Sequence, residues 1–341
     1  MKRYLSHVLC FLSVVVLVTI FSSFCAQAAE NVIRLKYSDF FPPSHKNSVL
    51  ADQWCKEVEK RTNGRIKVTH FAGGTLGPPQ QTYDGVVKAM FDIGTSVCQY
   101  TSGRFPVTEV IDLPLGYHSG HQATMLINAL YKKYRPKEYD DVKVLYLHAH
   151  GPGHFHTKKV IAKSEDLKGL KIKCSPNNAS IVSAFGAVPV TMPLPETYEA
   201  LQRGLADGIL LPYEALKGWR FGELIRCTLE NRGLSYSSAL FVVMNKNKWN
   251  SIPSDIQQIV EGINEEWIDK QGQTWDDIDK EGLNFGLEKG LKVIGASKAE
   301  EEMASERVRP ILDDYAKRMK GKGVPGDEIL QFCTGYLNTH K

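Results

Sequence analysis

The sequence predicts an α/β protein made of two lobes, each built around its own β-sheet. Three observations lead to this fold class. Short apolar strands alternate with amphipathic helices from residue 32 to about 98, an order typical of a mostly parallel sheet covered by helices. The alternation resumes after residue 142 with enough strands for a second sheet. A helical pattern from Pro253 to about Leu283 is long enough, at about 1.5 Å per residue, to cross both lobes.

The first unit follows directly from its residue pattern. Residues 32–41 alternate apolar and polar side chains and predict a strand that Pro42 and Pro43 end. A helix is expected over 45–62, with Leu50 and Trp54 on its apolar face and Asn63-Gly64 as the stop. The remaining elements expected here are strands at 65–71 and 92–98 and a short helix at 80–89.

The second unit begins after a loop and returns to the first. We expect a helix at 180–185 and another at 195–208 that Gly208 caps, and the pattern at 301–318 predicts a final amphipathic helix. The expected first lobe is 29–150 plus about 239–278, and the second is 151–238 plus about 279–341. Strands are expected at 143–150, 154–160, 167–174, 188–193 and 209–213, with a return strand at 239–249.

The first 28 residues have the composition of a secretory signal. Lys2 and Arg3 precede a mostly apolar run from Val8 to Phe21, which is too short to cross a membrane comfortably. Residues 26–28, Ala-Gln-Ala, suit a signal peptidase, so we expect cleavage near Ala28 and a periplasmic protein. An uncleaved N-terminal anchor remains an alternative.

Composition argues against several classes of function. The chain has 42 basic and 38 acidic residues, and removing Lys2 and Arg3 leaves 40 against 38, so no nucleic-acid partner is expected. Five of the seven cysteines lie beyond the signal, widely scattered and without a CxxC pair. Most are expected to be buried, although one pair could oxidise in this compartment. No cofactor is expected.

One histidine-rich segment is a candidate for metal chemistry. The sequence HAHGPGHFHT places His148, His150, His154 and His156 around a Gly-Pro-Gly crossover, and HxH on a strand puts both rings on one face. No neighbouring carboxylate completes a zinc site, so hydrogen-bonding histidines are the favoured interpretation. The sequence has no GxSxG, Walker, HExxH or GxGxxG motif, so a catalytic function is not expected. A secreted metal-dependent hydrolase that uses the histidine cluster remains the alternative.

Three linked segments carry a resemblance to a known family. They are residues 165–173, 185–209 and 245–260, and the middle one contains Gly-Ala-x-Pro-x-x-Met-Pro, Glu-x-Tyr-x-Ala-Leu-Gln and Ala-Asp-Gly. Residues 60–66 and 111–117 are similar too. Together they resemble the extracytoplasmic solute-binding subunits of TRAP transporters, the DctP family, over nearly the whole exported chain.

The resemblance implies a fold, a function and partners. The fold is the two-lobe periplasmic-binding-protein (Venus flytrap) architecture with a long helix spanning both lobes. The function is capture of a small organic carboxylate between the lobes and its delivery to the small and large membrane permease subunits, without catalysis. A monomer is expected. A binding protein for an ATP-driven importer or a sensor kinase remains an alternative.

The resemblance also implies the anion-binding residue. The family carries an arginine at the position of Lys173, where it binds the ligand carboxylate, so Lys173 is expected to be the carboxylate partner. Lysine keeps the charge but loses the planar, bidentate geometry. The alternative is a surface lysine whose amine reaches water. Lys171, on the same face but further from the strand end, is expected to face solvent.

Other positions depart from the family pattern toward apolar residues. Leu211 replaces an asparagine that bonds the ligand, and Phe40 stands where some relatives have a polar residue. A second arginine is absent near Gly153, which leaves His150 or His154 to supply a polar contact. A pocket of this kind would leave the hydroxyls of a sugar acid unpaired and would favour a monoanion with an apolar or aromatic body.

Three further residues are expected to complete the pocket. Gln99 and Tyr100 directly follow the third strand, and Leu194 precedes a predicted helix. For Phe40, Leu194 and Leu211 ordinary core packing remains the alternative interpretation.

Overall fold

The structure, a computed structural model, describes residues 32–340. The signal peptide expected over residues 1–28 lies outside the described residues. Each helix in the described part of the chain is too short or too polar to cross a lipid bilayer. The five cysteines of this part are buried and form no disulfide, so the expectation that one pair could oxidise is not met here.

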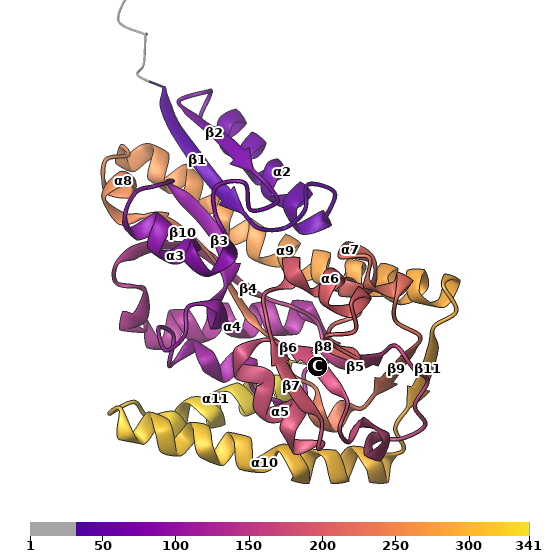
Figure 1. Cartoon of the computed structure of the whole chain (residues 1–341). Coiled ribbons are helices and arrows are strands. Elements are labelled where there is room, and N and C mark those ends of the chain that lie inside the picture. The colour runs from indigo at the N-terminus through magenta and orange to yellow at the C-terminus, as the bar shows by residue number, and fades with distance from the viewer. Residues whose placement is uncertain (1–31, 341) are drawn as a thin grey trace, which may run out of the picture.

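The first lobe is built on a five-stranded sheet in the order β2-β1-β3-β10-β4 (Figure 1). β1 is parallel to β2 and β3, whereas β10 returns from the second lobe and runs antiparallel to β3 and β4. Its strands are β1 (Ile33–Asp39), β2 (Ile66–Phe71), β3 (Ile93–Val97), β4 (Val142–Ala149) and β10 (Ala239–Asn245).

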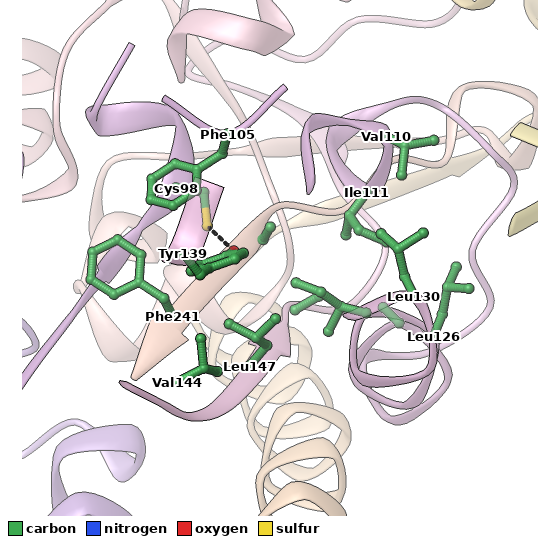
Figure 2. Close-up of a cluster of buried hydrophobic side chains, with 14 of the residues drawn as sticks. Cys98, Phe105, Val110, Ile111, Leu126, Leu130, Tyr139, Val144, Leu147 and Phe241 are labelled. Carbon is green, nitrogen blue, oxygen red and sulfur yellow. Dashed lines mark hydrogen bonds between the residues drawn. The ribbon is translucent and has the colours of Figure 1, made fainter. Parts of the chain in front are cut away.

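Apolar clusters cover both faces of this sheet. On one face, helices pack against strand residues such as Tyr37 and Val242. On the other face, Phe105, Tyr139 and Phe241 surround the Cys98 thiol, which lies 3.7 Å from the Tyr139 hydroxyl (Figure 2). The first-lobe helices are α2 (Lys46–Arg61), α3 (Thr82–Val87), α4 (Gly120–Tyr134) and α8 (Lys246–Asn250), with 3₁₀ turns η1 (Pro79–Gln81), η2 (Cys98–Tyr100), η3 (Thr108–Asp112) and η4 (Lys137–Tyr139).

The second lobe has a six-stranded sheet in the order β11-β9-β5-β8-β6-β7. β6 is parallel to β7 and β8, and β5 is antiparallel to β8 and β9. Its strands are β5 (His154–Thr157), β6 (Lys171–Cys174), β7 (Val188–Thr191), β8 (Gly208–Leu211), β9 (Cys227–Glu230) and β11 (Lys292–Gly295). Its helices are α5 (Ala179–Ala184), α6 (Thr197–Gln202) and α7 (Glu214–Gly218), with 3₁₀ turns η5 (Ser164–Leu167), η6 (Pro176–Asn178), η7 (Leu194–Glu196), η8 (Phe221–Glu223) and η9 (Arg232–Leu234).

One helix spans both lobes, as the sequence predicts. α9 (Ser254–Glu288) has 35 residues, or about 50 Å, and contacts α2, α4 and β4 in the first lobe and α7 in the second (Figure 1). It continues through Gly262 and Gly272. A Cβ at Gly272 would lie 2.9 Å from the His121 Cα, so glycine here permits close approach to α4. The predicted two-lobe α/β fold is confirmed.

The C-terminal segment differs from the expected lobe assignment. α10 (Lys298–Gly321) begins with a capping box in which Ser297 and Glu300 bond each other's backbone N–H. A further helix, α11 (Gly326–Thr339), follows it and packs on α4 and η3. The sequence pattern predicts the second lobe for residues from about 279 to 341, whereas Ile329, Cys333 and Leu337 pack in the first-lobe core.

Gly208 does not cap a helix. α6 ends at Gln202, and Gly208 is the first residue of β8. A Cβ there would lie 2.3 Å from the His156 carbonyl oxygen on β5, so the residue must be glycine for the two strands to pair.

Candidate functional site

Lys173 is buried between the lobes. It lies on β6 in register with Ile209 of β8, and the strand alternation directs both side chains to the face that packs toward the first lobe. The side chain is fully buried, and its Nζ has no hydrogen-bond partner among the described residues. Lys171, two residues earlier, is exposed, with its Nζ 3.0 Å from the Gly204 carbonyl. The surface-lysine alternative for Lys173 is therefore wrong.

The electrostatic setting of Lys173 favours an anion. Burial lowers the pKa of its amine from 10.5 to about 8, although electrostatic interactions with Cys174 and Glu214 partly raise it again. The amine is therefore still mostly protonated at pH 7. A buried ammonium without a hydrogen bond costs several kcal/mol, and a carboxylate placed against it would recover this cost.

The carboxylate of a buried histidine–carboxylate pair, His45 and Glu214, acts electrostatically on this amine. His45 caps α2 by accepting a hydrogen bond from the Asn47 N–H at Nδ1, so its Nε2 carries the proton and donates to Glu214 Oε2 at 2.9 Å. The Glu214 N–H in turn donates to Asp279 on α9. Burial raises the pKa of the Asp279 carboxyl well above its usual value.

Four of the predicted wall residues come together in one apolar cluster that joins the lobes. Phe40 and Tyr100 belong to the first lobe, and Leu194 and Leu211 to the second. The Phe40 and Tyr100 rings are 6.4 Å apart and nearly perpendicular. The Tyr100 hydroxyl accepts a hydrogen bond of 3.0 Å from the Leu194 N–H, which ties the two lobes together directly.

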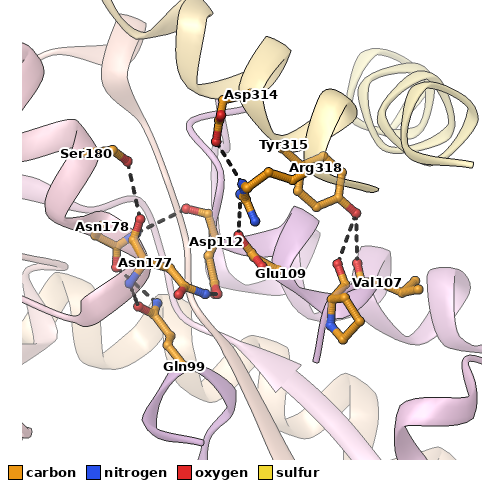
Figure 3. A network of polar contacts seen from close by, with 11 residues as sticks. Gln99, Val107, Glu109, Asp112, Asn177, Asn178, Ser180, Asp314, Tyr315 and Arg318 are labelled. Carbon is orange, nitrogen blue, oxygen red and sulfur yellow. Dashed lines mark hydrogen bonds and ion pairs between the residues drawn. The ribbon is translucent and has the colours of Figure 1, made fainter. Parts of the chain in front are cut away.

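Gln99 has a different setting from the wall residues. Its Nε2 donates to Asn178 Oδ1 at 3.0 Å, and its Oε1 accepts from the Asn177 N–H at 3.0 Å (Figure 3). The same Nε2 also donates to Ser238 Oγ at 2.9 Å. The amide is thus occupied by protein partners. Gln99 connects the first lobe to η6 of the second.

Asp112 completes this arrangement, which we call the interlobe network. Its carboxylate accepts hydrogen bonds from the Ala239 N–H at 2.9 Å and from Asn177 Nδ2 at 2.8 Å, and its carbonyl accepts from Asn178 Nδ2. Burial raises the pKa of Asp112 to about 7, although these hydrogen bonds oppose the shift. The network consists of Gln99, Asp112, Asn177, Asn178, Ser238 and Ala239.

The histidine segment does not assemble a metal site. Within residues 32–340 there is no group of three His, Cys, Asp or Glu side chains placed to hold a metal ion. His148 Nδ1 accepts from Trp275 Nε1 at 3.0 Å. His156 lies 2.7 Å from Thr228 Oγ1 and donates from Nε2 to the Leu211 carbonyl at 3.0 Å. Burial lowers the pKa of each to about 3, so both rings are neutral.

His150 and His154 differ from the other two histidines because each has a buried nitrogen without a partner among the described residues. These are Nε2 of His150 and Nδ1 of His154. Burial lowers the pKa of both rings to about 4, and the charge of Lys173 contributes to the shift at His150. The structure thus brings His150 close to the predicted anion partner.

Two aromatic residues that contact predicted site residues were not expected from the sequence. The Trp219 ring stacks 6.2 Å from Phe40, and its Nε1 is buried without a partner in the described part of the chain. The Tyr213 ring lies 4.8 Å from His154. Both follow β8 in a stretch rich in aromatic residues, which is the only signal that the sequence offers for them.

A separate groove of about 870 Å³ lies on the first lobe between α4, β4 and α9. Its lining includes charged side chains, such as the ion pair of Lys143 and Glu261, and contains none of the predicted site residues. It is distinct from the interlobe cluster around Lys173.

Comparisons with known proteins agree with the two-lobe fold. A family model described as bacterial extracellular solute-binding protein, family 7 (DctP) matches residues 37–318. A TRAP periplasmic solute-binding protein from Desulfovibrio salexigens is 32% identical, with a TM-score of 0.81 over 91% of this chain and 97% of that chain.

Two similar structures were solved with acids bound. One is a marine metagenome TRAP solute-binding protein specific for aromatic acid ligands, in complex with metahydroxyphenylacetate; it is 26% identical, with a TM-score of 0.86 over 91% of this chain and 99% of that chain. The other, from Rhodoferax ferrireducens with copurified benzoate, is 27% identical, with a TM-score of 0.85 over 90% and 98%.

Proposed function

This chain belongs to family 7 of the bacterial extracellular solute-binding proteins and is a TRAP-type solute-binding protein; from this premise we propose that its ligand is a small carboxylate with an apolar or aromatic body. The acid binds between the lobes with its carboxylate on Lys173. The lobes close around it by a hinge motion, and the closed form is the one that the permease subunits recognise.

The observation that carries this proposal is the buried Lys173 amine without a hydrogen-bond partner in the described residues. A folded protein rarely keeps an ammonium in such a place unless an anion pairs with it. Because the residues of the interlobe cluster around it are mostly aromatic or aliphatic, the rest of the ligand is matched by apolar surface.

The proposed wall consists of Phe40, Tyr100, Leu194 and Leu211, with His150 and His154 as polar contacts. Leu211 offers no side-chain hydrogen bond, so the hydroxyls of a sugar acid would remain unpaired against it. Two similar proteins were solved with aromatic acids, and the same class of ligand suits the apolar cluster here. Gln99 contributes indirectly, by holding the lobes together through the interlobe network.

The rival functions have less support. In a metal-dependent hydrolase His148 and His156 would have to give up the hydrogen bonds that they make to Trp275 and to the Leu211 carbonyl. A role with an ATP-driven importer or a sensor kinase has no supporting feature in this chain beyond a two-lobe fold. We also propose that the protein is exported to the periplasm, loses its signal near Ala28, acts as a monomer and performs no catalysis.

A ligand screen tests the proposal. At a hundred times its Kd, a ligand adds about 2.7 kcal/mol to the folded state, which a thermal shift detects readily. We expect phenylacetate, benzoate or indole-3-acetate to raise the melting temperature more than sialic acid does, with calorimetry supplying the Kd. Lys173→Met should abolish the shift, and Lys171→Met, on the same strand but exposed, should preserve it. A larger shift with sialic acid, or an unaffected Lys173→Met variant, would refute the proposal.

A further inference from the structure

The tautomer of His150 is fixed by its own backbone. Its Nδ1 lies 2.6 Å from the Gly151 carbonyl oxygen, and a carbonyl only accepts hydrogen bonds, so Nδ1 carries the proton and donates it. The ring is neutral at pH 7, since burial holds its pKa near 4. Nε2 therefore presents a lone pair and acts only as an acceptor.

The ring is also held in place from several sides. The His150 carbonyl accepts a hydrogen bond of 2.6 Å from Ser237 Oγ. The rings of Tyr236 and Trp275 meet the imidazole edge to face, at 5.5 and 6.2 Å between centroids. Because the surrounding side chains restrict rotation of the ring, Nε2 keeps its direction.

Two unsatisfied groups of opposite character thus lie in the same part of the molecule. The Tyr236 ring that contacts His150 donates its hydroxyl to the Leu210 carbonyl of β8 at 2.7 Å, and β8 pairs with β6 at Ile209 and Lys173. Lys173 Nζ is a pure donor and His150 Nε2 a pure acceptor, and each is buried without a partner among the described residues. They are not hydrogen-bonded to each other, although the charge of Lys173 is close enough to act on the His150 ring. A ligand that satisfies both must carry an anionic acceptor and, beside it, a hydrogen-bond donor.

We infer that the ligand is a 2-hydroxy acid with an aromatic or apolar body, whose carboxylate binds Lys173 and whose hydroxyl donates to His150 Nε2. This inference rests on the proposed function. A 2-oxo acid offers only a second acceptor to Nε2, and an unsubstituted acid leaves Nε2 unpaired. A 2-amino acid has donors, but its ammonium would be repelled by Lys173. His150 thereby determines specificity among acids of one shape.

Calorimetry at pH 7.5 on the exported chain tests this with mandelate, phenylglyoxylate, phenylacetate and α-methoxyphenylacetate, which is the methyl ether of mandelate. We expect mandelate to bind at least about tenfold tighter than the other three, because only its hydroxyl donates. In His150→Leu, which removes the acceptor, the preference for mandelate over phenylacetate should fall below about threefold while phenylacetate still binds. Equal affinities in the native protein, or a preference that persists in His150→Leu, would overturn the inference.

The outcomes separate the inference from the proposed function. If phenylacetate binds as well as mandelate, the inference alone fails; if none of the four acids binds, the proposed function fails as well. Should His150→Leu not fold, the comparison of mandelate with its methyl ether in the native chain still decides the matter. The ¹⁵N spectrum of labelled histidine adds a direct readout. We expect a protonated Nδ1 and a bare Nε2 whose signal shifts with mandelate; a protonated Nε2 would contradict the inference.

Discussion

Replacing Lys173 with methionine should close the ligand-free protein. Methionine has nearly the length of lysine but no charge, so it removes the buried ammonium without leaving a large cavity. Lowering the amine pKa from 10.5 to about 8 corresponds to about 3 kcal/mol, or roughly a few hundredfold in an equilibrium constant. Opening the lobes hydrates the amine and removes this cost. Without an anion the native protein therefore favours the open form, and Lys173→Met shifts the balance toward the closed form by up to that factor.

Small-angle X-ray scattering on ligand-free protein measures this shift as a smaller radius of gyration for Lys173→Met than for the native chain. Lys171→Met is the matched control and should scatter like the native chain, because Lys171 is exposed. The pH dependence has a defined sign. The closed form releases its proton near pH 8 and the open form near 10.5, so rising pH across this window favours closure of the native protein only. Identical scattering and identical pH profiles for native and Lys173→Met protein would show that the amine is not desolvated, which would refute the reasoning.

Three further outcomes are expected. Asn178→Ala breaks the interlobe network and should weaken ligand binding about 5- to 100-fold, seen as faster dissociation in surface plasmon resonance. Ser180→Ala, at an exposed position, should leave the dissociation rate unchanged. Equal effects of the two substitutions would count against a role of the network in binding. Gly282→Ala should lower the free energy of unfolding in urea by about 2 kcal/mol or more, because its Cβ would lie 2.0 Å from a main-chain oxygen. Gly262→Ala, where the space is open, should raise the free energy of unfolding by up to about 1 kcal/mol. The reverse order would contradict the packing of α9. EDTA should leave the melting temperature unchanged, since the histidines of residues 148–156 form no metal cluster within the described chain. A clear fall in the melting temperature would instead support the metal-dependent hydrolase.

Much of the fold could be predicted because its signals are local. The alternation around Tyr37 and the helical pattern from Pro253 to about Leu283 depend on near neighbours, and both elements formed, with the helix continuing to Glu288. Gly208 shows where local reasoning fails. A glycine after a helical pattern normally suggests a helix cap. Here glycine is required because a Cβ would collide with the His156 carbonyl oxygen, which lies 52 positions earlier in the chain. The helix at 326–339 was not expected because part of its apolar face packs on α4 and η3, which lie far away in the chain.

The site was predicted to a smaller extent, for a related reason. The position of Lys173 at a strand end could be found from the sequence, but its complete burial depends on packing between two lobes. Gln99 was placed next to the right strand, yet its partners Asn177 and Asn178 lie about 80 positions away. The His150 tautomer depends on the orientation of a single carbonyl, which no residue pattern encodes.

The helix α10 bears on how the lobes move. Its first half packs with the second-lobe core through Val308, and its second half with the first-lobe core through Tyr315, whose hydroxyl reaches the Pro106 and Val107 carbonyls (Figures 1 and 3). Pro310 stands between these halves, where the missing N–H weakens the helix ladder. Together with α9, this helix forms a second strut across the lobes, so a simple door-like swing about one axis would strain one strut or the other. We therefore expect opening to bend α9 and α10 together, with α10 bending at Pro310.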